Sequence, residues 1–320
     1  MKRNRLYFGI LSLILLLIIA WASYSMLHVG KQEETHIVSV IVNDSNNDRW
    51  IALHQGLEQA SDDYNIDLNF VSTGKFASVD EELALINREL ENGAEGIIVQ
   101  MIGEAEELEG ISSRVAVMLL ETDASPEGVY AFTGPDNTAI GSALADAIKE
   151  DFGEELSGKT VGILSGNEEK LSTQQRLAGL HEGLAETEAE ILWTIECANE
   201  QRGNTDALQG AAPVDIVIAL ENDETERMVD YLQTENARME SLLYGVGCSE
   251  KAVYYLDKGV IHMLLVPNEF NMGYQSMEAM ANQLHYRLTK AEDCQVDYLM
   301  VDRTNLYDED NQKVLFPIVQ

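Results

Sequence analysis

The sequence predicts an α/β protein made of two successive halves, each with a parallel sheet, that follow an N-terminal membrane helix or signal peptide. Short β-branched apolar runs alternate with amphipathic helical patterns along nearly the whole chain, which is typical of parallel βαβ units. This alternation restarts near residue 137 without a flexible linker, and the restart indicates a second half. The first 30 residues are basic and then apolar, and they precede the first predicted strand.

The first predicted unit reads HIVSVIVNDSNNDRWIALHQGLEQA. Residues 37–42 are almost wholly apolar and β-branched, as expected of a strand buried on both faces. Residues 43–48 form a polar turn, and Trp50, Leu53 and Leu57 then recur at helical spacing. Because ligands of open α/β sheets bind beyond the carboxyl ends of the strands, we expect this turn at a ligand site.

The remaining helices and strands are predicted from the same patterns. Ser78 and Glu81 have the spacing of a capping box at the start of a helix. Asn137 or Thr138 is expected to cap a further helix that runs to about Lys149, and the last long helix spans residues 273–288. The other apolar runs predict strands at residues 66–71, 96–100, 115–120, 130–133, 160–164, 191–195, 216–220, 242–246 and 263–266.

The N-terminal segment has three basic residues in its first five positions and then an uncharged run from Leu6 to Leu27. This run is long enough to span a bilayer, and the positive charge before it places the rest of the chain outside the cytoplasm. Two interpretations are open. Either Leu6 to Leu27 anchors the protein in the cell membrane, or a signal peptide is cleaved after Ala22 and the protein is secreted.

Composition narrows the function classes. The chain has 55 acidic and 21 basic residues and a formal net charge of −34. Because such an acidic surface repels phosphate groups, we expect no nucleic-acid partner. Cys197, Cys248 and Cys294 are widely spaced and show no zinc pattern. HExxH, GxSxG and P-loop motifs are missing from the sequence, which therefore predicts no enzyme and no metal or other cofactor.

Several segments together resemble the type I periplasmic binding proteins, in particular the ribose- and galactose-type sugar receptors of ABC transporters, whose fold is shared with lac-type repressor cores. The segments are IVNDSNNDRWIALHQGLEQA, GAEGIIVQ, FTGPDNTAIGSALADAI, RLAGLHEGL, VIALENDE, NEFNMGYQSMEAM and LYDEDNQKVLFPI. The resemblance implies two Rossmann-like lobes joined by a three-crossing hinge, with ligand in the cleft. Lobe one would comprise residues 36–134 and 268–298, and lobe two residues 135–267 and 299–320.

The resemblance also implies a function. We expect an extracytoplasmic solute-binding protein, for a carbohydrate, that delivers its small-molecule ligand to an ABC-type membrane permease by Venus-flytrap closure of the cleft. The alternative is a membrane-anchored sensor subunit that signals closure to a sensor kinase or chemoreceptor. A retained anchor and an altered pocket both favour the sensor.

Two ligand contacts are implied in the second half. Arg176 matches an arginine that forks onto ligand oxygens in the family, and a surface ion pair with Glu168 or Glu169 is the alternative. Asn222, followed by Asp223, matches a ligand-binding asparagine. Since both residue types also favour helix N-caps, a capping role competes with ligand binding.

Further contacts are implied around the cleft. Trp50 stands where the family stacks an aromatic ring on the sugar, although core packing explains it equally well. Asn47 and Arg49 share its loop, and Arg49 replaces a residue that is often aromatic. Glu121 and Asp123 follow the fourth strand and are candidate ligand contacts, although they could also be solvated acids of a surface loop. Asn199, in a later loop, is the remaining candidate.

Two positions depart from the pattern of the family. Gly247 stands where an aspartate is usual, and Pro267 where a glutamine commonly contacts ligand. A pocket that has lost a carboxylate and an amide should bind a hydroxyl-rich pentose less tightly. We therefore expect either a different ligand or weaker binding.

Overall fold

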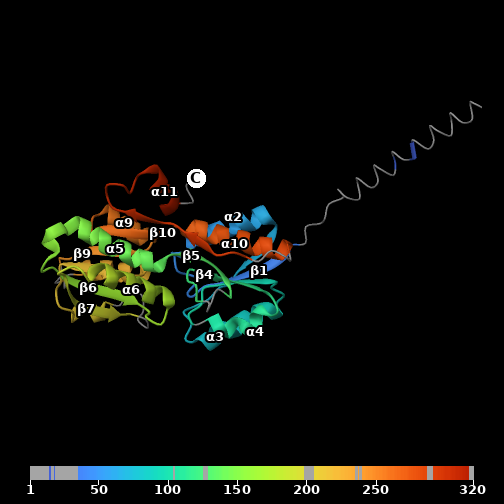
Figure 1. Cartoon of the computed structure of the whole chain (residues 1–320), viewed down its shortest axis with the longest axis horizontal. Coiled ribbons are helices and arrows are strands. Elements are labelled where there is room, and N and C mark those ends of the chain that lie inside the picture. The colour runs from blue at the N-terminus through green and yellow to red at the C-terminus, as the bar shows by residue number, and fades with distance from the viewer. Residues whose placement is uncertain are drawn as a thin grey trace, which may run out of the picture. The chain divides into compact units, whose positions relative to one another are not determined.

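The computed structural model describes residues 14, 15, 18, 35–103, 105–124, 129–197, 205–234, 237, 240–286 and 291–316. The chain divides into two compact units, Met1–Thr35 and His36–Gln320, and the second holds both lobes (Figure 1). Apart from three positions, the predicted membrane or signal segment lies outside the described residues. A search of those residues finds no helix with the length and apolar character needed to cross a bilayer.

Lobe one is built on a parallel sheet. Within the described residues it has six strands in the order β11-β5-β4-β3-β1-β2. The strands are β1 (His36–Ile41), β2 (Ile66–Phe70), β3 (Gly96–Val99), β4 (Ala116–Leu120), β5 (Ala131–Pro135) and β11 (Cys294–Val296), and all of these pair in parallel. The helices are α2 (Trp50–Tyr64), α3 (Val79–Glu91), α4 (Glu109–Ser112) and α10 (Glu269–His285), with a 3-10 turn η1 (Ala105–Leu108).

Helices cover both faces of this sheet, which is why its strands read as continuous apolar runs. Figure 1 shows α2 and α10 on one side and α3 and α4 on the other. Successive residues of β3 point to opposite faces: Ile98 packs in the core under α2 and α10, and Ile97 in the core under α3. The predicted capping box of α3 is confirmed in one half: the Ser78 side chain accepts from Glu81 N at 3.3 Å, but the Glu81 carboxylate accepts from Ala77 N at 2.8 Å rather than from Ser78 N.

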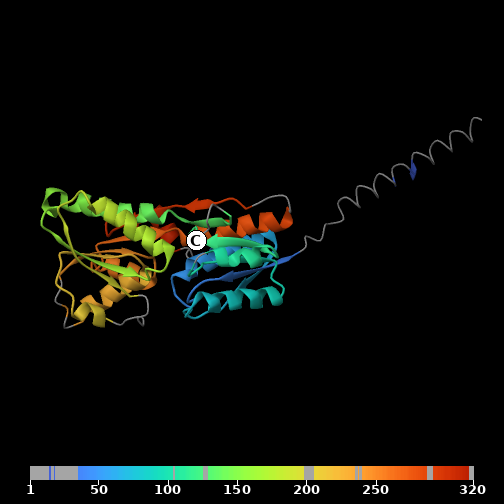
Figure 2. The same ribbon diagram turned by 60° about the horizontal axis from the view of Figure 1, so that its bottom comes forward.

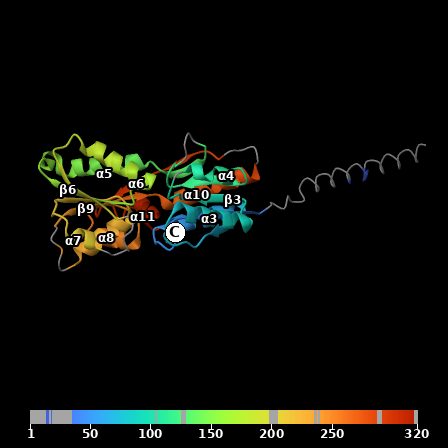
Figure 3. The same cartoon turned by 90° about the horizontal axis from the view of Figure 1, so that it is seen from below.

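Lobe two repeats this design. In the described part of the chain its sheet has six strands in the order β12-β10-β9-β8-β6-β7. They are β6 (Thr160–Gly166), β7 (Glu190–Glu196), β8 (Ile216–Ala219), β9 (Leu242–Val246), β10 (Met263–Pro267) and β12 (Tyr298–Val301), which is antiparallel to β10. The helices are α5 (Asn137–Phe152), α6 (Leu171–Leu184), α7 (Asp206–Gln209), α8 (Asn222–Leu232), α9 (Glu250–Asp257) and α11 (Glu309–Leu315), with the 3-10 turn η3 (Gly153–Leu156). Figure 3 shows α5 and α6 on one side of the strands and α7 and α8 on the other.

The two α/β lobes with mostly parallel sheets confirm the predicted fold class. Within the described residues the chain passes between the sheets three times, after β5, after β10 and between β11 and β12. Figure 2 shows the red segment of β11 and β12 running from one lobe to the other. These passages bring the carboxyl ends of both sheets toward the same cleft. The predicted boundaries of the lobes stay a prediction.

The predicted start of the last helix is wrong. It begins at Glu269 rather than residue 273, because the Asn268 side chain caps it by accepting from Asn271 N at 3.0 Å. The earlier start adds a helical turn next to the cleft and brings the Glu269 side chain into it.

Candidate functional site

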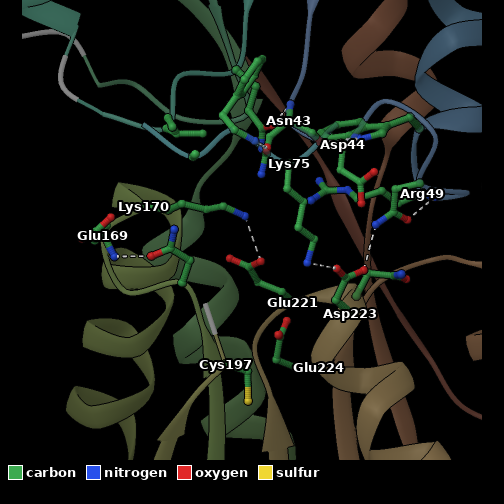
Figure 4. Close-up of a pocket in the computed structure, with 18 of the residues that line it drawn as sticks. Asn43, Asp44, Arg49, Lys75, Glu169, Lys170, Cys197, Glu221, Asp223 and Glu224 are labelled. Carbon is green, nitrogen blue, oxygen red and sulfur yellow. Dashed lines mark hydrogen bonds and ion pairs between the residues drawn. The ribbon is translucent and has the colours of Figure 1, made fainter. Parts of the chain in front are cut away.

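A cavity of about 370 Å³ lies between the lobes (Figure 4). Lobe one lines it with loops that follow β1, β2 and β3, and lobe two with loops that follow β6, β7 and β8. The side chains are mainly amides and charged groups, with few apolar ones. The lining residues include Asn43, Asp44, Asn47, Arg49, Trp50, Lys75, Gln100, Asn167, Glu169, Lys170, Cys197, Glu221, Asn222, Asp223 and Glu224. The position at the carboxyl ends of parallel strands is the one predicted from the sequence.

A buried cluster of charges joins the lobes beside this cavity. The Nη2 atom of Arg49 lies 2.8 Å from Oε1 of Glu121 and 3.1 Å from Oε1 of Glu269. The Nη2 atom of Arg176, from lobe two, lies 3.2 Å from the same Glu121 oxygen. Gln100 donates a hydrogen bond to the other oxygen of Glu121. We call Arg49, Glu121, Arg176 and Glu269 the cleft ion cluster.

The two acids of the cleft ion cluster differ in their charge states. Burial opposes the charge of Glu121, but the guanidinium groups of Arg49 and Arg176 hold the pKa of its carboxyl well below its usual range. Glu269 is in the opposite state: burial raises its pKa to about 7, and its ion pair with Arg49 compensates only in part. Glu121 is therefore a fixed anion at neutral pH, and Glu269 titrates near neutrality.

Arg176 is positioned by the packing of α6 against α5. Gly141 and Gly179 allow this close approach, because added Cβ atoms would lie 1.9 Å from the carbonyl oxygen of Arg176 and 2.1 Å from that of Thr138. The guanidinium donates to Asn137 Oδ1 at 2.8 Å and to the carbonyl oxygen at the end of β8, at residue 220, at 2.9 Å. The alternative prediction of a surface ion pair is wrong, because the side chain is 2% exposed and is held inside the cleft.

Asn222 is not a helix cap. Glu221 is the N-cap residue of α8, and Asn222 and Asp223 are its first two helical residues. The Asn222 side chain accepts from Ser249 N at 3.2 Å and lines the cavity. Asp223 reaches across the cleft instead, where its Oδ1 atom accepts from Asn47 Nδ2 at 2.8 Å.

The departure at Gly247 has a structural reason. Its φ of +141° is a conformation that favours glycine, and an added Cβ would lie 2.4 Å from Asn222 Oδ1. An aspartate would therefore collide with Asn222. Gly247 and Pro267 line a void of about 10 Å³ together with Arg49, Arg176 and Glu269, so almost no space remains between these two residues and the cleft ion cluster.

Trp50 belongs both to the core of lobe one and to the wall of the cavity. Its side chain is 2% exposed and packs in the core of lobe one, yet part of it lines the cavity. Its Nε1 donates to the carbonyl oxygen of Asn43 at 3.3 Å. The guanidinium carbon of Arg49 lies 4.1 Å from the centre of the indole ring, in a cation–π contact. That face of the indole is therefore occupied by Arg49.

The structure brings Asn47, Arg49, Trp50 and Asn222 to the cavity and places Glu121 and Arg176 beside it. Asp123 lies half-buried in the loop after Glu121 and is not among the residues that line the cavity. Asn199 lies outside the described residues. None of these placements tests a ligand contact, so the ligand roles stay predictions.

Sequence reasoning missed other charged residues of the site. Lys170 Nζ lies 3.1 Å from Glu221 Oε2, and Lys75 Nζ lies 3.7 Å from Asp223 Oδ2. Like Gln100, these residues follow the carboxyl ends of strands, and this position was the available signal. A metal centre is not indicated: the described residues contain no group of three His, Cys, Asp or Glu side chains that could hold an ion.

The chain belongs to the periplasmic binding protein family, because the family model described as a periplasmic binding protein domain matches residues 38–287. This is a family of solute-binding proteins rather than enzymes, and membership implies a location outside the cytoplasm. A search of curated protein sequences finds no significant match.

Solved structures share the fold at low sequence identity. An ABC transporter solute binding protein from Burkholderia graminis C4D1M, in complex with D-arabinose, is 15% identical, with a TM-score of 0.76 over 87% of this chain and 99% of that one. GanP, a glucose-galactose binding protein from Geobacillus stearothermophilus, is 21% identical, with a TM-score of 0.71 over 85% and 99%. The XylFII-LytSN complex matches with 14% identity and a TM-score of 0.69 over 84% and 98%.

Proposed function

We propose that this chain is an extracytoplasmic receptor for a small polar solute of the carbohydrate class, which binds between the lobes. The observation that carries the proposal is the cavity of about 370 Å³ lined from both lobes. Its size falls within the range of roughly 300–1,000 Å³ that is typical of small-molecule sites. Amides and charged groups at its wall suit hydroxyl groups, which both donate and accept hydrogen bonds.

The comparisons support the same solute class. Matched structures include a protein in complex with D-arabinose, one with bound D-allose and a glucose-galactose binding protein. Those sugars belong to those proteins. For this chain they support a search among pentoses, hexoses and their derivatives.

Binding would act through the relative position of the lobes. Asn47 of lobe one already contacts Asp223 of lobe two, and Glu121 contacts Arg176, so the cleft is closed in this structure. A solute in the cavity adds contacts to both lobes and thereby stabilises the closed form over an open one. A membrane permease of the ABC type that recognises the closed form would receive the solute from it.

Signalling to a membrane partner is the second candidate function. The observation that favours it is the cleft ion cluster, in which Arg49 and Arg176 contact carboxylates of the protein itself. The protein thus supplies part of its own closing contacts. One matched structure is a complex of XylFII with LytSN, which supports a protein partner for this fold. Retention of the predicted segment from Leu6 to Leu27 would hold such a sensor at the membrane.

A thermal-shift screen of the purified full-length chain tests the proposal. The panel contains pentoses, hexoses, amino sugars, polyols, short oligosaccharides and nucleosides. A solute at about a hundred times its Kd adds about 2.7 kcal/mol to the free energy of unfolding, which raises Tm measurably. A Tm rise confined to sugars and their derivatives, with saturable heat in calorimetry, supports the proposal. A response to nucleosides alone, or to nothing in the panel, contradicts it.

A further inference from the structure

The wall of the cavity that lobe two contributes is acidic. Of the described lining residues, Asp44, Glu169, Glu221, Asp223 and Glu224 carry carboxyl groups, whereas Lys75 and Lys170 are the cations that face them. Arg49 also lines the cavity, but its guanidinium is held by Glu121 and Glu269. The cavity is therefore lined by more carboxyl groups than available cations.

One of these carboxyl groups, that of Glu224, has a buried oxygen atom without a hydrogen-bond partner in the described part of the chain. Its side chain is 3% exposed, and within the described residues its Oε2 atom has no hydrogen-bond partner. The other oxygen, Oε1, lies 4.0 Å from Arg227 Nη2, at the limit of an ion pair. In Figure 4 the carboxyl group of Glu224 points into the space between Glu221 and Asp223. A buried polar atom without a partner costs about 1–3 kcal/mol, so such an atom on a residue that lines a ligand cavity indicates a missing hydrogen-bond partner.

The position of Glu224 in the first turn of α8 does not supply a hydrogen-bond partner for its Oε2 atom. Carboxylates near the start of a helix are stabilised by its positive end, and this applies to Glu224 as much as to its neighbours Glu221 and Asp223. These two also have partners, because Glu221 accepts from Lys170 and Asp223 from Asn47. Stabilisation by the helix end therefore does not explain why the Oε2 atom of Glu224, buried beside the acids Glu221 and Asp223, has no partner among the described residues.

We propose that the solute of this cavity carries a protonated amine, as an amino sugar does, and that the amine binds Glu224 between Glu221 and Asp223. This inference rests on the proposed function and narrows its ligand class. An ammonium group supplies three donors and one positive charge, which satisfies the Oε2 atom of Glu224 and offsets the excess of carboxylates. The hydroxyl groups of the same solute would meet Lys75 and the amide side chains on the wall that lobe one contributes.

Proton linkage gives the proposal a second signature. Burial and the neighbouring carboxylates of Glu221 and Asp223 raise the pKa of Glu224 to about 8, although Lys170 and Arg227 act against them. Glu224 is thus protonated in the empty cavity at neutral pH and must release its proton to bind a cation. Affinity for an amine that stays charged should rise between about pH 6 and about pH 8, and binding should release a proton.

Calorimetry of the full-length chain with matched sugar pairs tests this inference. The pairs are D-glucosamine with D-glucose, D-galactosamine with D-galactose, and 6-amino-6-deoxy-D-glucose with D-glucose. We expect at least one amine to bind about tenfold or more tightly than its parent, because close charge pairs across an interface contribute about 1.5 kcal/mol or more. Its heat should depend on the ionisation enthalpy of the buffer.

Two substitutions separate the site from general effects on the fold. Glu224→Gln keeps the shape and removes the charge, so it should remove the preference for the amine and its pH dependence. Glu82→Gln is the matched control, because Glu82 is also fully buried with an unpartnered Oε1 atom but does not line the cavity. It should leave the preference unchanged.

Equal binding of an amine and its neutral parent, or an amine preference that Glu224→Gln retains, would overturn the inference and leave the proposed function standing. Failure of every amine and every neutral sugar to bind would contradict both.

Discussion

The Nη2 atom of Arg176 lies 3.2 Å from Oε1 of Glu121, and this contact joins α6 of lobe two to the end of β4 in lobe one. Both side chains are at most 3% exposed. The pair therefore closes the cleft in a dry environment, where a charge that loses its partner is expensive. Glu121 adopts a left-handed backbone conformation, with φ of +69°, and it also binds Arg49. Its carboxylate is the centre of the contacts between the lobes.

Glu121→Gln should lower the free energy of unfolding by about 3 kcal/mol or more. The substitution leaves the guanidinium groups of Arg49 and Arg176 buried without their shared anion. Denaturant titration measures the change. Glu109→Gln, at an exposed acid of the same lobe, should change stability by less than about 0.5 kcal/mol. Similar effects of the two substitutions would show that the cluster does not stabilise the closed cleft.

Glu269 should make stability fall as pH rises toward neutrality. Its pKa is about 7 in the folded chain, against an ordinary value of 4.5, so between about pH 5 and about pH 7 the folded chain keeps a proton that the unfolded chain has lost. The expected loss is up to about 1.4 kcal/mol per pH unit. Glu269→Gln should remove this slope in denaturant titrations at the two pH values, whereas Glu91→Gln, at an exposed acid, should retain it.

Glu121 should show the opposite sign. Because its folded pKa is depressed, the stability it contributes is present above its unfolded value and is lost only as pH falls through the folded one. Because Glu121 also raises the pKa of Glu269, the comparison is made in the Glu269→Gln background. There the stability lost on Glu121→Gln should stay constant from about pH 8 to about pH 5. If the difference in the free energy of unfolding disappears near pH 6, Glu121 is not the fixed anion described here.

Gly247→Ala should destabilise the protein by roughly 1–3 kcal/mol. The added methyl group meets both an unfavourable φ of +141° and the side-chain oxygen of Asn222 at 2.4 Å. Thermal unfolding measures the loss. Gly110→Ala is a suitable comparison, since nothing lies within 4 Å of its added Cβ. If alanine is tolerated equally at both positions, Asn222 does not determine the glycine at position 247.

Asn47→Ala should shift the lobes toward an open form without unfolding either of them. Its side-chain amide donates to Asp223 across the cleft, and a hydrogen bond to a charged group contributes about 1.5–3 kcal/mol. Small-angle X-ray scattering should show a larger radius of gyration. Asn87→Ala removes a local bond to the carbonyl oxygen of Leu83 within α3, so its scattering should match that of the unmodified chain.

Much of the fold could be predicted because each strand is a local pattern. Runs such as residues 37–42 and 216–220 are apolar and β-branched over the length of a buried strand, and both form one. The start of α10 was missed because its cap, Asn268, directly follows Pro267 and the apolar stripe begins later. The cap of α8 was misplaced because Asn and Asp favour that position by propensity, whereas the extended backbone is at Glu221.

The cleft ion cluster could not be predicted in this way. Arg49, Glu121, Arg176 and Glu269 come from four distant segments, and only the closed arrangement of both lobes decides which charges meet. The departure at Arg49 was visible in the sequence, but its partners were not. The missing partner of Glu224 could not be predicted either, because it depends on Lys170 binding Glu221 and Asn47 binding Asp223.

The central claim is that the solute binds between the lobes in the cavity of about 370 Å³. A crystal structure of the chain grown with a sugar identified by the screen measures this directly. We expect density for the sugar between Lys75 of lobe one and Glu224 of lobe two, with the cleft ion cluster intact. Density for the sugar outside the cleft, or in place of the Arg49 and Glu121 contact, would contradict the claim.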